Sequence, residues 1–297
     1  MKSFDLIEPA TLDEAVALLD PEDPGVRAIA GATALMLLMK ARLFQPVRLI
    51  SLRRLTGALR GVRVAERRGA ESGGLRIGAM TTLSELERSP LVRAAVPVMS
   101  RALRTLSNVR IRNVATLGGH LAHGDPHMDL PPILMTLGAR VRAVSQRGER
   151  WIAMNDFAIG YYQTAIARDE LIAEVEVPAQ PAGVCAWYAK FTALSADDWP
   201  AVGVAVWYCA NAGRIAEARI AVSAATDRPV RVAGAEAALV GASTTPAVFA
   251  RAADAAADEV DPLTDIRGSA AYKREMVRVH VRRALERALL AESTPTA

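Results

Sequence analysis

The chain has 297 residues, of which 51% are apolar, so it is long enough for two compact domains and apolar enough to exclude wholesale disorder. Lysine and arginine number 36 against 32 aspartates and glutamates, which leaves a net charge of +4 spread along the chain. So small an excess helps to attract an anionic cofactor but is no nucleic-acid footprint, and we expect no nucleic-acid partner.

The two cysteines, Cys185 and Cys209, limit the metal chemistry of the chain. An iron–sulfur cluster takes four thiolates, which this chain cannot supply, and two cysteines do not form a secreted disulfide framework. Charged residues interrupt the N-terminus, where a signal peptide would be apolar, and also the most apolar segment, residues 28–44. We therefore expect no membrane span and a cytoplasmic location.

A strand, a turn of small residues and an apolar helix follow one another near the N-terminus. A capping box at Thr11 predicts a first helix through Leu19. Residues 26–30 indicate a buried strand, Gly31 opens a turn, and residues 33–43 predict a helix that is apolar almost all round and therefore buried. The N–H groups of the turn and the positive end of the helix would face the same point, which suits an anion.

The middle of the chain alternates short strands with capped helices. Strands are expected at residues 49–52, 61–64, 75–78, 139–144 and 151–152, with a polar hairpin at 66–74. A second capping box opens a helix at Thr82, and residues 92–106 carry one long helical pattern.

Residues 171–177 alternate as a strand. The alternation places Leu171, Ala173, Val175 and Val177 on one face and Ile172, Glu174 and Glu176 on the other. Ile172 is then an apolar residue on a charged face. A contact with a neighbouring loop and a contact with a ligand explain it equally well.

After a linker at residues 178–183 the pattern changes. Residues 184–192, 201–210 and 215–224 predict a three-stranded antiparallel meander, followed by helices at 230–239 and 246–259. The last helix carries an apolar stripe of Val277, Val281, Ala284, Leu285, Ala288 and Leu289. Its arginines lack interleaved aromatics, which favours a solvated helix face or a subunit interface over nucleic acid or an acidic membrane.

Two glycine-bearing loops are the candidate binding elements. The first comprises Ala30, Gly31, Ala32, Thr33 and Ala34, and the second comprises Thr116, Leu117, Gly118, Gly119 and His120. Glycine lets main-chain amides approach a phosphate without a Cβ in the way, and Thr33 adds a hydroxyl donor. The first loop is neither G-x-G-x-x-G nor a P-loop, so an ordinary strand-to-helix turn explains it as well, and a tight surface turn is the alternative for the second.

The second loop runs into a segment rich in histidine. His120, His123, Asp125 and His127 are residue types that bind zinc, but their spacing matches no zinc motif and Gly124-Asp-Pro126 would break a helix presenting them. We favour a surface loop, or one packed partly on a cofactor, over a metal site. Asp129 could accept hydrogen bonds from a sugar-like diol. No G-x-S-x-G and no convincing catalytic triad is present.

Taken together, these residues resemble the FAD-binding medium subunit of molybdenum hydroxylases, the family of xanthine dehydrogenase and aerobic CO dehydrogenase. The segment AGATALMLLMKARLFQP (30–46) is similar to the family's A-G-G-x-S/D-L-L-P-x-M-K. The segment IRNVATLGGHLAHGDPHMDLP (111–131) is similar to I-R-N-x-x-T-I-G-G-N-L-A-H-A-D-P-x-x-D-L-P, and residues 269–289 are close to the family's C-terminal helix. The resemblance spans nearly the whole chain.

The resemblance implies an α+β fold similar to that of vanillyl-alcohol oxidase. It would comprise FAD-binding subdomains at residues 1–55 and 56–177, a C-terminal domain with a three-stranded antiparallel sheet and helices at 178–290, and a tail at 291–297. The two loops would hold the pyrophosphate of FAD from opposite sides, and Asp129 would contact its ribityl or phosphate region. Ile172 would lie against the isoalloxazine ring, and Tyr188 and Lys190 would lie beside it.

The resemblance also implies partners. Substrate would be oxidised at a molybdenum cofactor on a large subunit, and electrons would pass through [2Fe-2S] clusters on a small subunit to FAD here, in a dimer of heterotrimers. This chain departs from the family at Ala32, Ala34 and His120, where glycine, serine or aspartate, and asparagine are usual. A stand-alone flavin oxidase and a non-enzymatic metal-binding or assembly protein are the alternatives.

Overall fold

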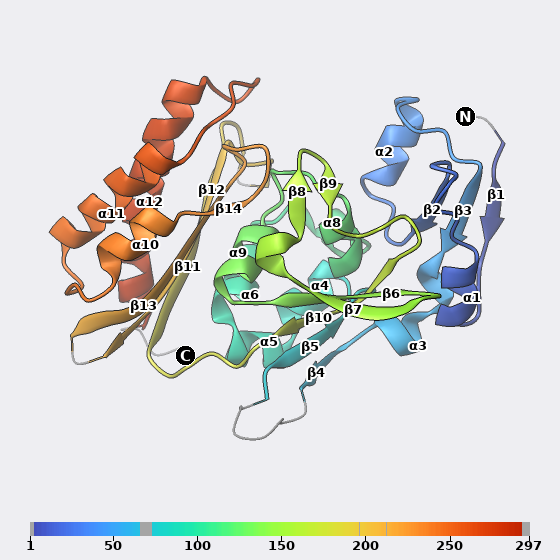
Figure 1. The fold of residues 1–297 in the computed structure, drawn as a ribbon, viewed down its shortest axis with the longest axis horizontal. Helices are drawn as coiled ribbons and strands as arrows, with labels where there is room; N and C mark the ends of the chain where they lie inside the picture. The colour runs from blue at the N-terminus through green and yellow to red at the C-terminus, as the bar shows by residue number, and fades with distance from the viewer. Residues whose placement is uncertain (1–2, 66–72, 196, 212, 293–297) are drawn as a thin grey trace.

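Three β-sheets follow one another along the molecule in the computed structural model, which describes residues 3–65, 73–195, 197–211 and 213–292 (Figure 1). The main strands are β1 (Asp5–Ile7), β2 (Val26–Ile29), β3 (Arg48–Ser51), β4 (Val62–Val64), β5 (Leu75–Gly78), β6 (Arg140–Ser145), β7 (Gly148–Ala153), β10 (Leu171–Val177), β11 (Val184–Phe191), β12 (Val202–Asn211), β13 (Arg214–Ser223) and β14 (Val230–Arg231). A small hairpin is formed by β8 (Ala158–Gly160) and β9 (Gln163–Thr164). The expected turn at 66–74 lies outside the described residues, apart from its last two.

The two longest helices, α11 and α12, lie near the C-terminus, and the other helices have at most seven residues. They are α1 (Leu12–Ala17), α2 (Leu35–Lys40), α3 (Thr56–Leu59), α4 (Leu83–Arg88), α5 (Pro90–Ala95), α6 (Pro97–Leu103), α7 (Val109–Arg112), α8 (Leu117–Ala122), α9 (Leu130–Thr136), α10 (Ala233–Leu239), α11 (Pro246–Glu259) and α12 (Ala270–Glu292). Both expected capping boxes are confirmed, at Thr11 before α1 and at Thr82 before α4. The whole is α+β, as expected.

The first sheet is parallel, in the order β1-β3-β2. The second has the order β4-β5-β10-β6-β7 and is antiparallel throughout. Helix α1 packs against the second sheet, because Ala15 and Val16 share a buried cluster with Val144, Leu171 and Ala173. The two sheets are therefore joined by a continuous apolar core.

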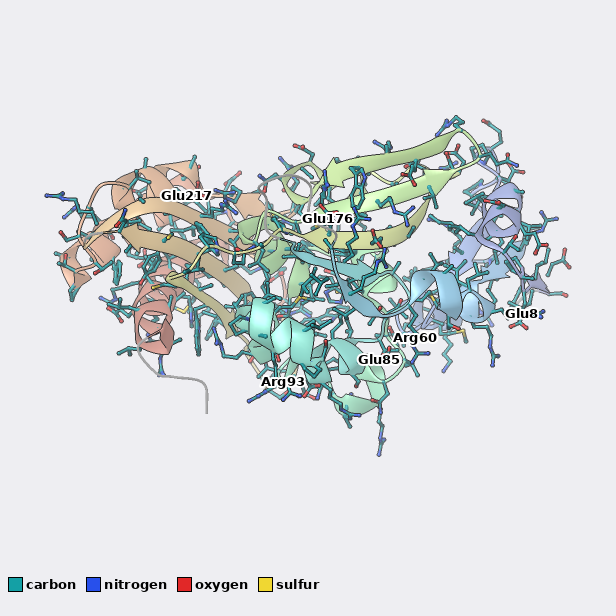
Figure 2. The ribbon with its side chains drawn as sticks, turned by 90° about the horizontal axis from the view of Figure 1, so that it is seen from below. Glu8, Arg60, Glu85, Arg93, Glu176 and Glu217 are labelled. Carbon is teal, nitrogen blue, oxygen red and sulfur yellow. The ribbon has the colours of Figure 1, made fainter. Side chains whose placement is uncertain are left out.

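The outer face of the five-stranded sheet is charged. Arg76 Nε lies 2.9 Å from Glu176 Oε2, Arg140 Nη2 lies 2.6 Å from the other oxygen, and the guanidinium of Arg140 stacks 4.5 Å above the ring of Trp151. Figure 2 labels Glu176 beside the strands of this sheet, and it shows Arg60 and Glu85 close together. A row of ion pairs of this kind keeps one face of an antiparallel sheet in water.

A bulge in β10 changes which residues share a face. Ile172 pairs with Ala143 and Glu174 pairs with Arg142, so the register shifts between them. Beyond the bulge Val175 packs in the same core as Ile172, while Leu171 packs in a different one with Ala173. The expected placement of Ile172 on the charged face is therefore wrong, because strict alternation ends where a bulge adds a residue.

The third sheet, β11-β12-β13-β14, separates two cores. Alternate residues of β12 point to opposite sides: Val204, Val206 and Tyr208 pack with α10–α12, whereas Ala205 and Trp207 pack in the core that includes β5, β6 and α9. Figure 1 shows the three C-terminal helices covering one face of this sheet and α9 and α6 lying against the other. The three expected strands are confirmed, and β14 is a fourth strand that replaces the start of the expected helix at 230–239.

Two helix expectations need correction. The pattern at 92–106 is two helices, because Pro97 lacks an N–H and forces Val96 out of helical geometry (φ −141°). Helix α2 is not buried: Met39 is its one buried residue, and Leu37 is 62% exposed. Helix α2 lies at the end of the molecule beside the three-stranded sheet (Figure 1), so only one side of it finds a protein neighbour.

Candidate functional site

The two glycine loops lie against each other. The first follows β2 and leads into α2, and the second forms the start of α8. A Cβ on Gly31 would overlap the carbonyl oxygen of Val114 and come within 2.9 Å of the Cα of Ala115. A Cβ on Gly119 would lie 3.8 Å from the Cβ of Ala30. The sequence-based expectation that two distant turns converge therefore holds for their geometry.

The second loop uses its own amides internally. The N–H of Leu117 donates to Thr81 O at 2.9 Å, that of Gly118 to Ala79 O at 2.8 Å, and that of Gly119 to Thr116 Oγ1 at 3.2 Å. Thr116 is the N-cap of α8. These first-turn donors, which were expected to meet a ligand, are occupied by protein acceptors.

The first loop is the opposite case. Within the described part of the chain, no amide from Gly31 through Ala34 donates to a protein acceptor, and the Thr33 hydroxyl has no partner either. Met36 N donates to Ala32 O at 2.9 Å, so a helical turn already begins at Ala32. The N-cap of α2, Ala34, makes no side-chain cap. A row of unsatisfied N–H groups at the start of a helix is suited to an anion.

Ala32 has a left-handed backbone, with φ 60°. This region favours glycine, and an alanine there carries a cost of about 1–2 kcal/mol. The structure thus explains why glycine is usual at this position in the resembling family.

Gly118 and His120 serve the packing of α8. A Cβ on Gly118 would lie 2.7 Å from the Cβ of Ala79, so the helix could not approach β5 with any larger residue. The His120 ring is buried, and its Nε2 accepts a 3.4 Å hydrogen bond from the N–H of Leu130. Burial lowers the pKa of His120 to about 3, so the ring is neutral.

Asp129, Tyr188 and Lys190 form one buried cluster. The Tyr188 hydroxyl donates to Asp129 Oδ1 at 2.7 Å, and Lys190 Nζ donates to the other oxygen at 3.3 Å and to Thr105 O at 3.1 Å. Burial raises the pKa of the Asp129 carboxyl, and the nearby Lys190 opposes part of this rise. Both carboxylate oxygens are engaged by protein donors, so the structure brings these three expected site residues together around a shared charge.

Ile172 lies in the core, 6% exposed. The bulge in β10 accounts for its position, so the argument from an odd charged face no longer points to a ligand. Only a small edge of this side chain remains open to contact with one.

The histidine-rich segment is not a surface loop, which was one of the two expectations for it; the other, a loop packed partly on a cofactor, stays a prediction. His120, Asp125 and His127 are buried, and the Asp125 carboxylate accepts hydrogen bonds from His127 Nδ1 (2.7 Å) and the Tyr162 hydroxyl (2.8 Å). No group of three or more potential ligands arranged for a metal ion occurs among the described residues. Sequence reasoning missed the partners of this segment, which lie far along the chain, and only the close Asp-x-His spacing hinted at a pair.

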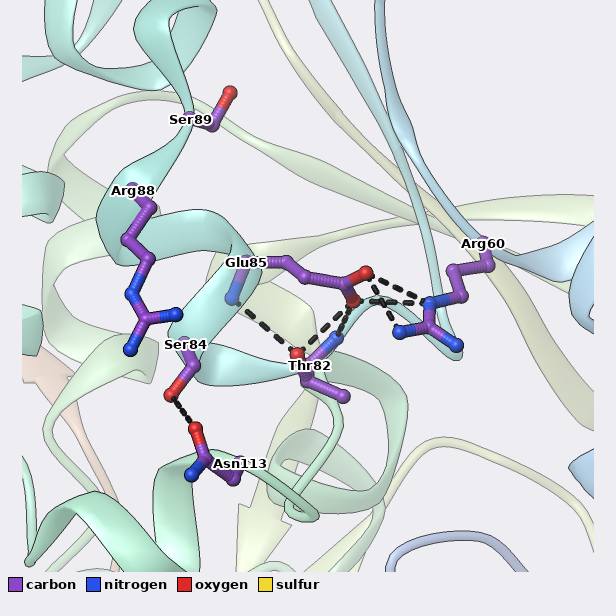
Figure 3. Close-up of a pocket in the computed structure, with 7 residues that line it drawn as sticks. All are labelled: Arg60, Thr82, Ser84, Glu85, Arg88, Ser89 and Asn113. Carbon is purple, nitrogen blue, oxygen red and sulfur yellow. Dashed lines mark hydrogen bonds and ion pairs between the residues drawn. The ribbon is translucent and has the colours of Figure 1, made fainter.

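A separate pocket of about 400 Å³ opens beside α4 (Figure 3). It is lined by Arg60, Thr82, Ser84, Glu85, Arg88, Ser89 and Asn113, none of which is an expected site residue. Arg60 Nη2 lies 2.6 Å from Glu85 Oε1, Thr82 N donates to the same carboxylate at 2.8 Å, and the Ser84 hydroxyl donates to Asn113 at 2.6 Å. These polar groups of the pocket therefore bond to one another: Glu85 to Arg60 and Thr82, and Ser84 to Asn113.

Family models match almost the entire chain. Residues 2–180 match the FAD binding domain in molybdopterin dehydrogenase, and residues 187–288 match the CO dehydrogenase flavoprotein C-terminal domain. The gap between the matches, residues 181–186, covers the end of the connection between β10 and β11 and the first residues of β11.

Individual proteins are similar over comparable lengths. The carbon monoxide dehydrogenase medium chain of Hydrogenophaga pseudoflava is 32% identical over 96% of both chains. The nicotine 6-hydroxylase medium subunit of Paenarthrobacter nicotinovorans is 35% identical over 93% of this chain and 94% of its own length. A solved structure of the carbon monoxide dehydrogenase from Hydrogenophaga pseudoflava superposes with a TM-score of 0.91 at 34% identity, covering 97% of this chain and 98% of that one.

Proposed function

This chain belongs to the FAD-binding subunit family of the molybdenum hydroxylases, and from that membership we propose that it carries electrons from a partner's iron–sulfur clusters through FAD to an external acceptor. It is an oxidoreductase component, and FAD is its cofactor. FAD, when bound, supplies the redox chemistry, because it accepts and releases electrons singly or in pairs. No helix among the described residues is long and apolar enough to cross a membrane.

The observation that carries the proposal is the row of free amides from Gly31 through Ala34. These donors start a helix and have no acceptor among the described residues. Because glycine has no side chain, a gap lies between Gly119 and Ala30. A diphosphate is an anion of the right kind for such a place. We infer that the first loop donates the hydrogen bonds, whereas the second loop supplies the space.

We propose that the remaining site residues surround the flavin end of the cofactor. Lys190 would place its ammonium beside the ring, where a cation favours the reduced, anionic form. Asp129 would hold that ammonium, since Lys190 already donates to it, and the Tyr188 hydroxyl would hold Asp129 by donating to its other oxygen. Ile172 would contribute its exposed edge to the wall. In the two loops, the residues that contact the cofactor would be those predicted from the sequence, residues 30–34 and 116–120.

We further propose a three-part division, at residues 1–55, 56–177 and 178–290, with residues 291–297 as a tail. The resembling proteins are named medium chains or medium subunits, which supports partner chains of other sizes. The two cysteines of this chain cannot hold the clusters. We therefore infer a small iron–sulfur subunit, a large molybdenum-cofactor subunit and a dimer of heterotrimers.

Mass spectrometry of the native complex, combined with flavin, iron and molybdenum analysis, tests this function. We expect one FAD on this chain and co-purifying subunits that carry iron and molybdenum. Flavin on an isolated chain that turns over its own substrate would favour a stand-alone oxidase. A bound metal without flavin would favour the metal-binding alternative.

A further inference from the structure

The histidine-rich segment, residues 120–127, makes contacts between two parts of the molecule. We call residues 1–177 the FAD-binding part and residues 178–290 the C-terminal part. On the FAD-binding side, Asp125 is fully buried at its side chain. It accepts hydrogen bonds from the main-chain N–H and Nδ1 of His127, at 2.9 and 2.7 Å, and from Tyr162 at 2.8 Å. Burial opposes ionisation of Asp125, but these donors outweigh it and lower its pKa. The imidazole is thereby fixed with its other nitrogen pointing away from Asp125.

That other nitrogen meets the C-terminal part. His127 Nε2 lies 3.5 Å from Asp265 Oδ2, and the same oxygen lies 2.7 Å from Lys273 Nζ. Lys273 is completely buried and also donates to Ala224 O at 3.3 Å. Asp265 lies between α11 and α12, and Lys273 lies on α12. Two further contacts cross the same boundary: Ala224 N donates to Pro126 O at 2.9 Å, and Trp199 stacks on His127 at 6.2 Å.

We propose that His127 is the positioning residue of an interdomain latch, formed by Asp125, His127, Tyr162, Asp265 and Lys273, which holds the C-terminal part in place over the FAD-binding part. His127 is the one member that faces a carboxylate on each side. A carboxylate accepts hydrogen bonds, so Nδ1 donates to Asp125 at 2.7 Å, and Nε2 faces the Asp265 carboxylate at 3.5 Å. Removing one side chain from a buried set of charged and polar groups leaves the charges of the others without a partner, which destabilises the folded state.

The latch has a consequence for the site. His127 and Asp129 belong to the same short connection between α8 and α9, whereas Tyr188 and Lys190 lie on β11 of the C-terminal part. The bonds from Tyr188 and Lys190 to Asp129 therefore cross the boundary that the latch closes. Opening the latch would move the ammonium of Lys190 relative to the FAD-binding part without unfolding either part.

Hydrogen–deuterium exchange on the purified complex tests the latch, with variants His127→Ala, Asp265→Asn and the pair together. We expect His127→Ala to speed exchange at residues 263–268 and 224–226 by about fivefold, which corresponds to about 1 kcal/mol. Asp265→Asn should speed it by more, because it also takes the carboxylate from the buried Lys273 ammonium, and the pair should add nothing to the effect of Asp265→Asn. His280→Ala is the matched control, since His280 packs on Phe191 within the C-terminal part. It should leave those segments unchanged.

A second measurement separates positioning from general destabilisation. The absorption spectrum of the bound flavin should change in His127→Ala and in Asp265→Asn but not in His280→Ala, because only the first two move Lys190. Asp265→Asn is nearly isosteric but also takes the carboxylate from the buried Lys273 ammonium. Tyr162→Phe removes only the hydroxyl that donates to Asp125, so it keeps the test open should the other variants fail to fold. Unchanged exchange in Asp265→Asn, additive effects in the pair, or an unaltered flavin spectrum in both single variants would overturn the proposal. The exchange measurement does not depend on electron transfer, so its failure is distinct from failure of the proposed function.

Discussion

Ala30 and Gly119 face each other across the junction of two loops, with 3.8 Å between the Cβ of Ala30 and the place where a Cβ on Gly119 would stand. The loops themselves are already in contact, because Gly31 lies directly against the main chain at Val114. There is free space at this junction because Gly119 has no side chain. Beside it lie the unsatisfied amides of the first loop.

Gly119→Val should strip FAD without unfolding the chain. Its nearest neighbours would be Thr116 Oγ1 at 3.0 Å and Ala30 at 3.8 Å, so the larger side chain would fill the gap between the loops while the core stays closed. We expect flavin content to fall at least about tenfold, the effect of losing about 1.4 kcal/mol of binding. The ratio of flavin to protein absorbance measures it. Gly57→Val, in α3 with nothing within 4 Å, is the control, and full occupancy in Gly119→Val would contradict this placement.

Gly118→Ala should instead destabilise the fold. The added methyl would lie 2.7 Å from the Cβ of Ala79, inside a packed core that can yield only by moving α8 away from β5. Overpacking of this kind costs about 1–3 kcal/mol. Urea unfolding should show the loss as a lower midpoint. A stable Gly118→Ala chain that has lost only its flavin would mean that this glycine serves the ligand and not the packing.

Ala32→Gly should stabilise the chain. The backbone at Ala32 has φ 60°, which glycine adopts without the penalty of a Cβ, and we expect a gain of about 1 kcal/mol in the free energy of unfolding. Ala34→Gly is the matched control, because Ala34 has an ordinary φ of −86° and glycine there should cost up to about 1 kcal/mol. Thermal unfolding of both variants would show opposite shifts. Equal destabilisation by the two would contradict the assignment of strain to Ala32.

Local sequence signals predicted the elements well. Capping boxes depend on residues three positions apart, and both occur as expected, at Thr11 and Thr82. The buried stripe of the last helix also follows from spacing alone, and five of its six members are fully buried: Val277, Val281, Ala284, Leu285 and Ala288.

The errors arise where distant residues decide the outcome. The bulge that turns Ile172 into the core depends on the pairing of β10 with β6, which periodicity within β10 does not contain. The exposure of Leu37 depends on where α2 lies in the molecule and not on its apolar composition. The acceptors that occupy the amides of Gly118 and Gly119 include Ala79, from another strand–helix connection. The convergence of the two loops was accessible only through the family resemblance.

Lys190→Met should destabilise the chain strongly. It would leave the Asp129 carboxylate buried with only the Tyr188 hydroxyl as donor, since the 3.3 Å ion pair is lost. Breaking one side of a buried pair costs about 3–5 kcal/mol. The double change Lys190→Met with Asp129→Asn should recover much of that loss, because no charge is then left unpaired. Thermal unfolding of the two variants and the native chain measures this, and equal stability of Lys190→Met and the native chain would show that the pair contributes nothing.

His120 should lower the free energy of unfolding in acid, over a pH range set by the pKa of this residue. Burial lowers that pKa from 6.5 to about 3 in the folded chain, so between these values the unfolded chain binds a proton that the folded chain does not. The contribution to stability is fully present above pH 6.5 and is lost as the pH falls toward about 3. The free energy of unfolding changes by at most about 1.4 kcal/mol per pH unit through this group.

The variant His120→Asn carries the residue usual in the family, which does not titrate. Its free energy of unfolding should therefore fall less steeply with decreasing pH than that of the native chain. Urea unfolding of both chains at a series of pH values from about 7 to about 4 provides the comparison. Parallel curves would mean that the ring is hydrated in the folded chain and does not lie in the core as the structure places it.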